Sequence, residues 1–281
     1  MGDLRTPEGD DALVPARHSE GREGALNRVL EARWLLLQWV QRDFTVQYRQ
    51  SVLGVVWAIV QPLMLLLFYG LVFNRVLGIQ APHGNYVVFA LCGLVPWTFI
   101  TSVLSRSIVS LASASYVIKQ VYFPRSLISL ASTGVTAIDL LLGATVLIGA
   151  QVIANGELHL ATLALIPIFL CVLLLMAAVG VVTAVLGAFV RDLRFVLPLL
   201  TQVGFIATPV MYPRSQVPSR YAWVYDANPI GRVIEAVRAC VIEGRWPSFG
   251  LLAGLFVLGV LSLVLALAYS SAVEDRLPDL L

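Results

Sequence analysis

Long stretches without a formal charge constrain this chain more than any other feature of its sequence. No Asp, Glu, Lys or Arg occurs at positions 50–74, 158–190 or 246–273. A helix needs about 20 apolar residues to cross the ~30 Å hydrocarbon layer of a bilayer, because each residue adds about 1.5 Å. Hydrophobic residues make up 58% of the chain and charged residues 13%, whereas soluble domains are roughly 45–50% apolar and 25% charged. The sequence therefore predicts a protein embedded in a membrane.

The apolar runs predict an all-α, polytopic membrane protein with six transmembrane helices. Residues 26–281 would form one transmembrane domain, and the polar, acidic residues 1–25 a disordered cytoplasmic tail. That tail lacks the apolar core of a cleavable signal peptide. The predicted spans are 52–73, 86–107, 127–153, 163–189, 195–210 and 251–269.

The basic residues set the expected orientation. Most Lys and Arg residues fall on the inner side when both termini are placed in the cytoplasm, in agreement with the positive-inside tendency. The agreement is partial, because most of the arginines left outside lie in one long segment, 211–246. The arginines placed outside are Arg75, Arg214, Arg220, Arg232, Arg238 and Arg245.

An amphipathic helix at 26–50 is predicted to precede the first span. Apolar residues recur there every three or four positions, the spacing of one helical face. Arg42 and Arg49 lie largely on the opposite side, so the helix is expected to lie in the cytoplasmic interface with its basic face toward lipid headgroups. The alternative is a simple lead-in to the first span. The apolar positions are Leu26, Leu30, Trp34, Leu37, Val40, Phe44 and Tyr48.

The first span is expected to be kinked and rich in aromatic residues. Pro62 removes one helical hydrogen bond, which is tolerated in lipid where neighbouring helices satisfy the freed carbonyl. Trp57, Phe68 and Tyr69 present ring faces on which the C–H faces of sugars can stack. Aromatic side chains in spans also contact lipid and other helices, and the sequence leaves both roles open.

Residues 110–125 are predicted to form a cytoplasmic loop that is unusually apolar. The loop contains the only lysine of the chain, Lys119, together with Tyr116, Tyr122 and Phe123. Exposed apolar patches often mark interfaces, so this loop either packs on its own membrane domain or enters a partner protein. The pattern alone favours neither.

Asp139 is an ionisable residue inside the third predicted span. Such residues usually face the interior of a helix bundle or a water-filled cavity, and they mark functional sites by default. The alternative is a carboxyl group that only serves helix packing, hydrogen-bonded near Thr133 or Thr136. The sequence does not decide between the two.

The outer segment 211–246 is expected to return toward the membrane. Asn228 and Pro229 are the cap and first-turn residues of a helix, and apolar residues then recur along one stripe. Re-entrant helices of this kind can dip into the outer leaflet and keep their charges toward water or the protein interior. The charged residues spaced three apart on the other side, where they can pair, are Arg232, Glu235 and Arg238.

The sequence holds no motif for ATP hydrolysis or metal binding. A phosphate-binding loop requires Gly-x-x-x-x-Gly-Lys-Ser/Thr, but Lys119 follows Ile118. The histidines and cysteines lack the spacing of metal ligands, and the cysteines are expected to be packing residues. Scattered acidic residues disfavour an enzyme of lipid-linked sugars and an ion-coupled carrier. We therefore expect no catalytic residue, metal or cofactor in this chain.

Several short motifs in a fixed order carry a resemblance to a known family. They are RDFTVQYRQSVLG at 42–54 with VWAIVQP at 56–62, KQVYFPR at 119–125, TPVMYP at 208–213, and Asn-Pro at 228–229 ahead of 235–238. In this order they resemble the membrane subunits of bacterial polysaccharide ATP-binding-cassette exporters, which export O-antigen, capsule, teichoic acid or galactan chains. The resemblance covers about 28–269.

The resemblance implies a permease in the bacterial cytoplasmic membrane that lacks its own ATPase. The permease would act as a homodimer with two nucleotide-binding subunits, which would bind the ATP and Mg²⁺. Its cargo would be a polyprenyl-diphosphate-linked polysaccharide, moved through a channel at the dimer axis among membrane lipids. Nucleic acid is not an expected partner.

The resemblance also assigns roles to single residues. Those expected to couple the permease to the ATPase are Ser113, Tyr116, Lys119, Tyr122, Phe123 and Arg125. Those expected to meet the lipid diphosphate at the interface are Arg42 and Arg49. The channel-lining candidates are Trp57, Phe68, Tyr69 and Phe205. The outer gate residues are Tyr212, Asn228, Pro229, Arg232, Glu235 and Arg238.

Two other functions stay open at this point. A related branch of exporters with the same six-span plan moves drugs or small lipids. A membrane enzyme or assembly scaffold for glycolipids is the alternative of a different class.

Overall fold

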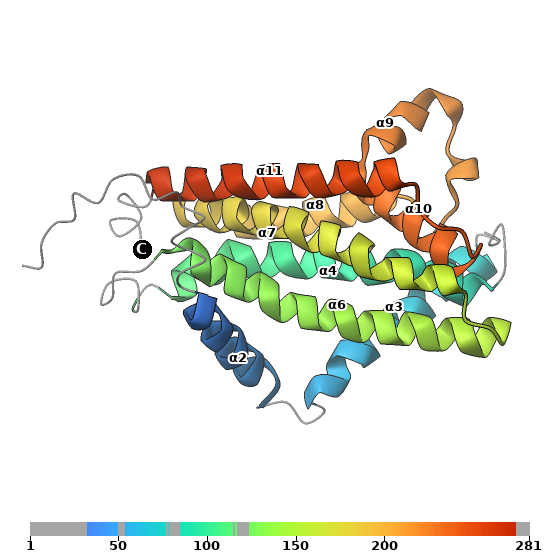
Figure 1. The fold of residues 1–281 in the computed structure, drawn as a ribbon, viewed down its shortest axis with the longest axis horizontal. Helices are drawn as coiled ribbons and strands as arrows, with labels where there is room; N and C mark the ends of the chain where they lie inside the picture. Colours follow the sequence, from blue (N-terminus) through green and yellow to red (C-terminus); the bar gives the residue numbers. More distant parts are fainter. Residues whose placement is uncertain are drawn as a thin grey trace, which may run out of the picture.

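Helices account for all the regular structure in the part of the chain that is described, which confirms the all-α prediction. In the computed structural model, the described residues are 33–49, 54–76, 78, 85–114, 116 and 124–273. The predicted tail at 1–25 lies outside them. The longest helices run side by side along the long axis of the molecule (Figure 1). They are α4 (Tyr86–Ser113), α6 (Ser126–Asn155), α7 (Leu165–Phe189) and α11 (Phe249–Val273).

Five of the described helices are long and apolar enough to cross a membrane, so the protein is a multi-pass membrane protein. Four are the long helices just named, with α7 preceded by the 3₁₀ turn η3 (Leu160–Ala164). The fifth joins α3 (Trp57–Gly70) to the π-helical turn η2 (Leu71–Val76). The helix at the remaining predicted span, α8 (Leu193–Ala207), has 15 residues and a length of about 22 Å. Because that is shorter than a ~30 Å hydrocarbon layer, the count of six spans stays a prediction.

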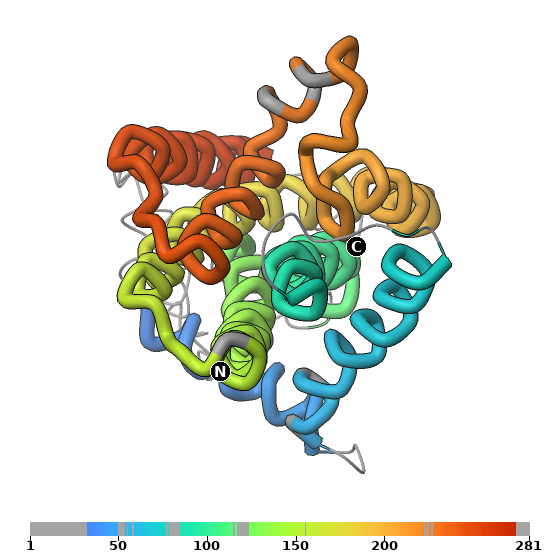
Figure 2. The backbone as a smooth tube through the Cα atoms, turned by 90° about the vertical axis from the view of Figure 1, so that its right-hand side faces the viewer, coloured from blue at the N-terminus to red at the C-terminus, as the bar shows by residue number. Residues whose placement is uncertain are grey.

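The helix α4 lies at the centre of the bundle, with α3 and α8 at its rim (Figure 2). Seventeen of the 28 residues of α4 are buried, compared with 6% of the span 59–76. Glycine allows neighbouring backbones to approach α4 closely. A Cβ atom on Gly187 of α7 would lie 3.0 Å from the carbonyl carbon of Ile108, and one on Gly93 would lie 3.0 Å from the Cα of Val210.

The first described helix, α2 (Arg33–Arg49), packs obliquely against α6 (Figure 1). Only part of the predicted apolar stripe contacts the bundle, because Trp34 and Leu37 are exposed. Trp39, which is not in the stripe, is buried. Val40, which is in the stripe, packs against Gly134, where an added Cβ would lie 2.7 Å from a Val40 methyl group. Val40 and Tyr48 of the predicted stripe therefore pack on the bundle, whereas Trp34 and Leu37 of the same stripe do not. Apolar side chains surround this helix, so periodicity could not indicate which of them face protein.

The segment after α8 contains short helices that project from one end of the bundle (Figures 1 and 2). The last of them, α10 (Pro229–Val241), packs against α4 and α7, and its apolar stripe is buried as predicted. The side chain of Asn228 caps α10 by accepting hydrogen bonds from the backbone N–H groups of Ile230 and Gly231, at 3.0 and 3.4 Å. The short helices before α10 are η4 (Arg214–Gln216), η5 (Ser219–Tyr221) and α9 (Ala222–Ala227).

The three cysteines, Cys92, Cys171 and Cys240, are buried and free. All three belong to the largest core cluster, together with other residues of α4, α7 and α10. The interpretation as packing residues is confirmed.

Candidate functional site

A polar cavity of about 250 Å³ lies where the end of α2 and the start of α3 meet α4 and α6. Polar side chains of this kind are costly inside a membrane bundle unless they pair with one another or line a cavity that holds water or a ligand. The lining residues are Gln47, Tyr48, Trp57, Gln61, Pro62, Thr98, Phe99, Ser102, Arg106, Asp139, Leu140 and Gly143.

One strong hydrogen bond closes a wall of this cavity. The Tyr48 hydroxyl of α2 donates to Oδ1 of Asp139 in α6 at 2.5 Å. Burial, and then the hydrogen bond to the Asp139 carboxyl, raise the pKa of Tyr48, while the positive charge of Arg106 acts in the opposite sense. Tyr48 is therefore a stable donor that fixes α2 to the bundle.

The hydrogen-bond partner of Asp139 is therefore Tyr48. The sequence analysis had proposed Thr133 or Thr136 as its neighbours. Those two hydroxyls donate instead to backbone carbonyls of their own helix, Thr133 to Ser129 at 3.0 Å and Thr136 to Thr133 at 2.8 Å. Asp139 serves helix packing through Tyr48, and it also faces the cavity.

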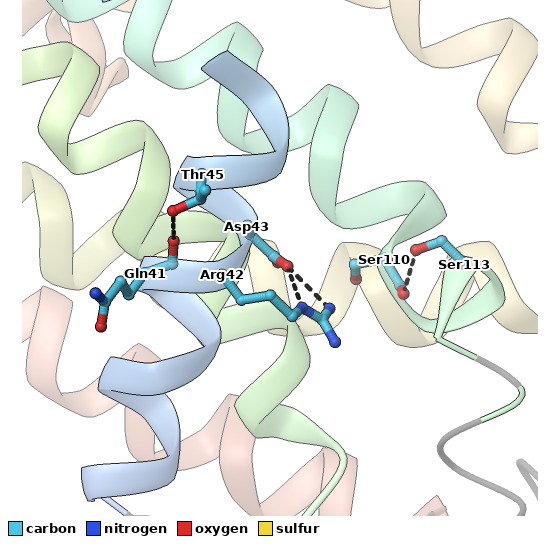
Figure 3. A network of polar contacts seen from close by, with 6 residues as sticks. All are labelled: Gln41, Arg42, Asp43, Thr45, Ser110 and Ser113. Carbon is cyan, nitrogen blue, oxygen red and sulfur yellow. Dashed lines mark hydrogen bonds and ion pairs between the residues drawn. The ribbon is translucent and has the colours of Figure 1, made fainter. Parts of the chain in front are cut away.

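A second hollow of about 450 Å³ lies beside α2, nearer the end of α4, and it includes the predicted residues Arg42 and Ser113. Figure 3 shows the Arg42 guanidinium bound by its fork to Asp43, with two nitrogens at 2.9 and 3.0 Å from Oδ1. The guanidinium also stacks over the Trp39 ring at 3.9 Å. The Ser113 hydroxyl donates to the Ser110 carbonyl at 2.8 Å. An anion in this hollow would compete with Asp43 for Arg42.

The two hollows share a wall made of Gln47 and Arg106, which line both of them. The first hollow reaches Asp139 in the middle of α6, and the second reaches Ser113 at the end of α4. Polar side chains therefore continue from the end of the bundle into its interior beneath α2.

Three aromatic rings form a cluster between α3, α4 and α8. The Tyr69 and Phe205 rings are 4.7 Å apart, and the Trp97 and Phe205 rings are 5.9 Å apart. Phe68 contacts Tyr69 at 5.3 Å, but 62% of its surface is exposed. Three of the four predicted channel residues lie together: Phe68, Tyr69 and Phe205. The fourth, Trp57, lies apart from them, in the polar cavity.

The predicted outer gate residue Arg238 is buried, with 5% of its surface exposed, which corrects the expectation that it projects from the polar side of its helix. Its guanidinium donates to the Val210 carbonyl at 2.7 Å and lies 3.8 Å over the Phe89 ring. The predicted pairing with Glu235 is present at 3.2 Å. Burial lowers the pKa of Arg238, and Glu235 opposes that change. Arg238 therefore joins α10 to α4 and to the segment after α8.

Hydroxyl and amide groups hold the rest of the outer segment. The Tyr212 and Tyr225 hydroxyls are 2.7 Å apart, and the Tyr212 hydroxyl also donates to the Ile206 carbonyl at 2.6 Å. The Asn228 amide donates to the Thr208 hydroxyl at 3.1 Å, so the residue that caps α10 also binds the end of α8. Arg232 is exposed on the outer surface.

The predicted coupling residues within the described ranges, Ser113, Tyr116 and Arg125, lie at the opposite end of the bundle from α10. Tyr116 is 72% exposed, whereas Arg125 is 9% exposed at the start of α6. Arg49 is exposed at the end of α2. The other predicted coupling residues, Lys119, Tyr122 and Phe123, lie outside the described residues.

Reasoning from the sequence missed most of the polar cavity. Gln47 and Gln61 lie in the quoted motifs but received no role there, and Thr98, Ser102 and Arg106 lie in none of the motifs. These five residues come from three helices that meet only in the fold. The signal available was weak: each is a polar residue within or next to an apolar run.

Comparison with known proteins assigns the chain to a family. The family model described as ABC-2 type transporter matches residues 35–242. The chain belongs to the ABC-2 type transporter family. It is thus a membrane subunit of a transporter.

Relatives of this ABC-2 protein carry names from polysaccharide export. The chain is 27% identical over 248 residues to the O-antigen export system permease protein RfbA of Klebsiella pneumoniae, covering 88% of this chain and 95% of that one. It is 27% identical over 256 residues to RfbA of Myxococcus xanthus, with 89% and 95% covered. It is also 27% identical over 211 residues to the polysialic acid transport protein KpsM of Escherichia coli, with 72% and 79% covered.

Proposed function

We propose that this ABC-2 protein is the permease subunit of an ATP-driven exporter that moves a lipid-linked polysaccharide across the bacterial cytoplasmic membrane. It acts as a homodimer with two nucleotide-binding subunits, and both of its termini lie in the cytoplasm. The names of its relatives, O-antigen export permease and polysialic acid transport protein, support the cargo class.

The observation that carries the proposal is the unburied rim formed by α3 and α8. Only Phe205 of α8 is buried, and its exposed apolar side chains include Leu199, Val203 and Ile206. On α3, Leu67 and Phe68 are exposed. A helix as short as α8 does not cover the ~30 Å layer alone, so we infer that a second copy covers this rim and that a conduit forms between the copies.

Such a conduit suits the cargo for a physical reason. A long polar glycan cannot dissolve in hydrocarbon, because each polar group left without a hydrogen bond there costs several kcal/mol. A protein-lined path keeps those groups satisfied while the polyprenyl tail stays in lipid. The aromatic cluster of Tyr69, Phe205 and Trp97 lies at this rim, between α3 and α8.

The end of the bundle with Tyr116 is proposed to bind the ATPase. Tyr116 is a large side chain with 72% of its surface exposed, and exposed apolar surface often marks an interface. Tyr122 and Phe123 follow in the same loop and are proposed to enter the partner. ATP-driven closure of the ATPase would then move the permease through this loop.

Arg42 and Arg49 are proposed to meet the diphosphate of the cargo. Arg42 already binds Asp43, so the diphosphate has to displace or share that carboxylate. Bidentate guanidinium contacts to phosphate are among the stronger charge-assisted hydrogen bonds.

The test is co-purification of the full chain with the ATPase encoded beside it, followed by ATP hydrolysis in lipid nanodiscs. We expect a stable complex with two copies of each subunit and faster turnover when extracted lipid-linked glycan is added. Stimulation only by drugs or short lipids would favour the related exporter branch. Chemical turnover of a glycolipid by the chain without any ATPase would support a membrane enzyme and refute the proposal.

Two variants test the coupling loop within the same assay. Tyr122→Asp and Phe123→Asp each place a charge in the proposed interface, so we expect lower recovery of the ATPase and loss of stimulation. Tyr221→Asp is a matched control, because Tyr221 is exposed near the opposite end of the bundle. Unchanged recovery in the loop variants would reject the coupling role.

A further inference from the structure

We propose that the polar cavity beneath α2 binds one sugar unit of the lipid-linked glycan, next to the diphosphate and inside each protomer. The inference rests on the proposed function, and it adds a second binding site, separate from the rim between the copies. It assigns a ligand to Gln47, Gln61, Ser102 and Trp57, which line the cavity.

The charges of the cavity favour a neutral ligand. It contains one guanidinium, Arg106, and one carboxyl group, Asp139, together with amides and hydroxyls. A phosphate placed there would meet the Asp139 carboxyl without any surplus of positive charge, and burying unbalanced charge is costly. A sugar carries many hydroxyl groups that both donate and accept, so it can bond to amides, hydroxyls and both charged groups.

The cavity also offers hydrogen-bonding capacity that the described residues leave unused. Oε1 of Gln47 is buried and accepts no hydrogen bond within the described part of the chain. A buried acceptor without a donor costs about 1–3 kcal/mol, so a rotation of the Gln47 amide toward a ligand hydroxyl or a water in the cavity is favoured. The Thr98 hydroxyl donates to the Val95 carbonyl at 3.0 Å, which leaves its oxygen free to accept from a ligand.

Size and ring faces fit a sugar unit. A volume of about 250 Å³ corresponds to roughly eight water molecules at ~30 Å³ each, enough for one sugar ring with a few waters. Trp57 and Phe99 line the same cavity, and aromatic faces can cover the apolar C–H face of a sugar ring. Ordinary membrane lipid tails would leave the polar lining unsatisfied.

The position relative to Arg42 connects the sugar to the diphosphate. Arg42 lines the neighbouring hollow, and Gln47 and Arg106 line both hollows. Arg42 and Gln47 are separated by five positions of one helix, or about 7.5 Å along its axis. A single lipid-linked molecule can therefore place its diphosphate at Arg42 and its first sugar in the cavity.

The test measures how much one sugar adds to binding. The full chain, with its ATPase, is placed in nanodiscs prepared without sugar-based detergent. Dissociation constants are measured for polyprenyl diphosphates that carry one N-acetylglucosamine, one galactose or no sugar. We expect at least one sugar to tighten binding. Gln61→Ala and Ser102→Ala should each reduce that gain about threefold to tenfold, because each removes one hydrogen bond.

Gln216→Ala is the matched control, because Gln216 is an exposed glutamine in η4 that lines neither the cavity nor the rim of α3 and α8. It should keep the full gain, and all variants are checked for unchanged thermal stability. A sugar gain lost in Gln61→Ala and Ser102→Ala alone supports the site. The sugar site is overturned if neither sugar tightens binding to the unaltered protein. It is also overturned if both variants keep the full increase in affinity that the sugar gives. ATPase stimulation by the complete glycan lipid is scored separately, so the proposed function can stand or fall independently.

Discussion

Gly93→Ala is expected to be among the most damaging single-methyl changes in this protein. A Cβ atom at Gly93 of α4 would lie 3.0 Å from both the Cα and the carbonyl carbon of Val210, and closer still to its carbonyl oxygen. These are backbone atoms, so no side-chain rotation relieves the clash. The segment at Val210 has to move away from α4.

The magnitude follows from what that movement breaks. Overpacking of this kind costs about 1–3 kcal/mol. The Val210 carbonyl also accepts a hydrogen bond from Arg238 at 2.7 Å, and losing a hydrogen bond to a charged group costs about 1.5–3 kcal/mol. Alanine stabilises a helix interior by about 1 kcal/mol relative to glycine, which offsets part of this loss. The expected net loss of stability is about 1.5–5 kcal/mol.

The assay is thermal unfolding of detergent-purified protein, followed by fluorescence-detected gel filtration at one fixed heating protocol. At about 2–4 °C per kcal/mol for a chain of this size, the midpoint of thermal unfolding should fall by at least about 3 °C. The control is Gly149→Ala in α6, because no atom lies within 4 Å of a Cβ there. If both variants unfold within about 2 °C of each other, the contact between α4 and the segment after α8 is not as described.

The remaining predictions concern polar contacts that join separate helices. Tyr48→Phe removes the hydrogen-bond donor to Asp139 and should cost about 1.5–3 kcal/mol of stability. Amide hydrogen exchange in α2 should therefore rise, and equal exchange in the variant and the unaltered protein would show that this hydrogen bond does not hold α2. Arg238→Met leaves the Val210 carbonyl without its donor and should cost about 1–3 kcal/mol, measured by thermal unfolding. Arg232→Met, at an exposed position, should cost at most about 1 kcal/mol, because exposed charged contacts contribute little to stability; similar losses in both variants would contradict the difference in burial. Asn228→Ala removes the α10 cap and should cost about 0.5–2 kcal/mol, with rescue by Asn228→Asp.

The predicted elements agree best with the structure where a local signal sufficed. The cap at Asn228 and the helix after it were read correctly, because capping depends on residues a few positions apart. The pairing of Glu235 with Arg238 was also confirmed. The burial of Arg238 was not predicted, since its partner Val210 is 28 positions away.

The candidate site was predicted only in part for the same reason. Asp139 stood out as a charge in an apolar run, but its partner Tyr48 is 91 positions away. Gln47, Gln61 and Arg106 were not predicted to share a site, because a cavity lined by several helices exists only after those helices pack.

The sequence by itself determined that this chain enters a membrane as helices, because charge-free runs and the demand for internal backbone hydrogen bonds leave no other solution. Only the tertiary structure decided which faces of those helices meet. Lipid tails are as apolar as leucine, so the pattern of apolar residues cannot distinguish a face toward lipid from a face toward protein. The exposed Trp34 and the buried Trp39 on the same helix show that distinction, which only packing against α6 and its neighbours creates.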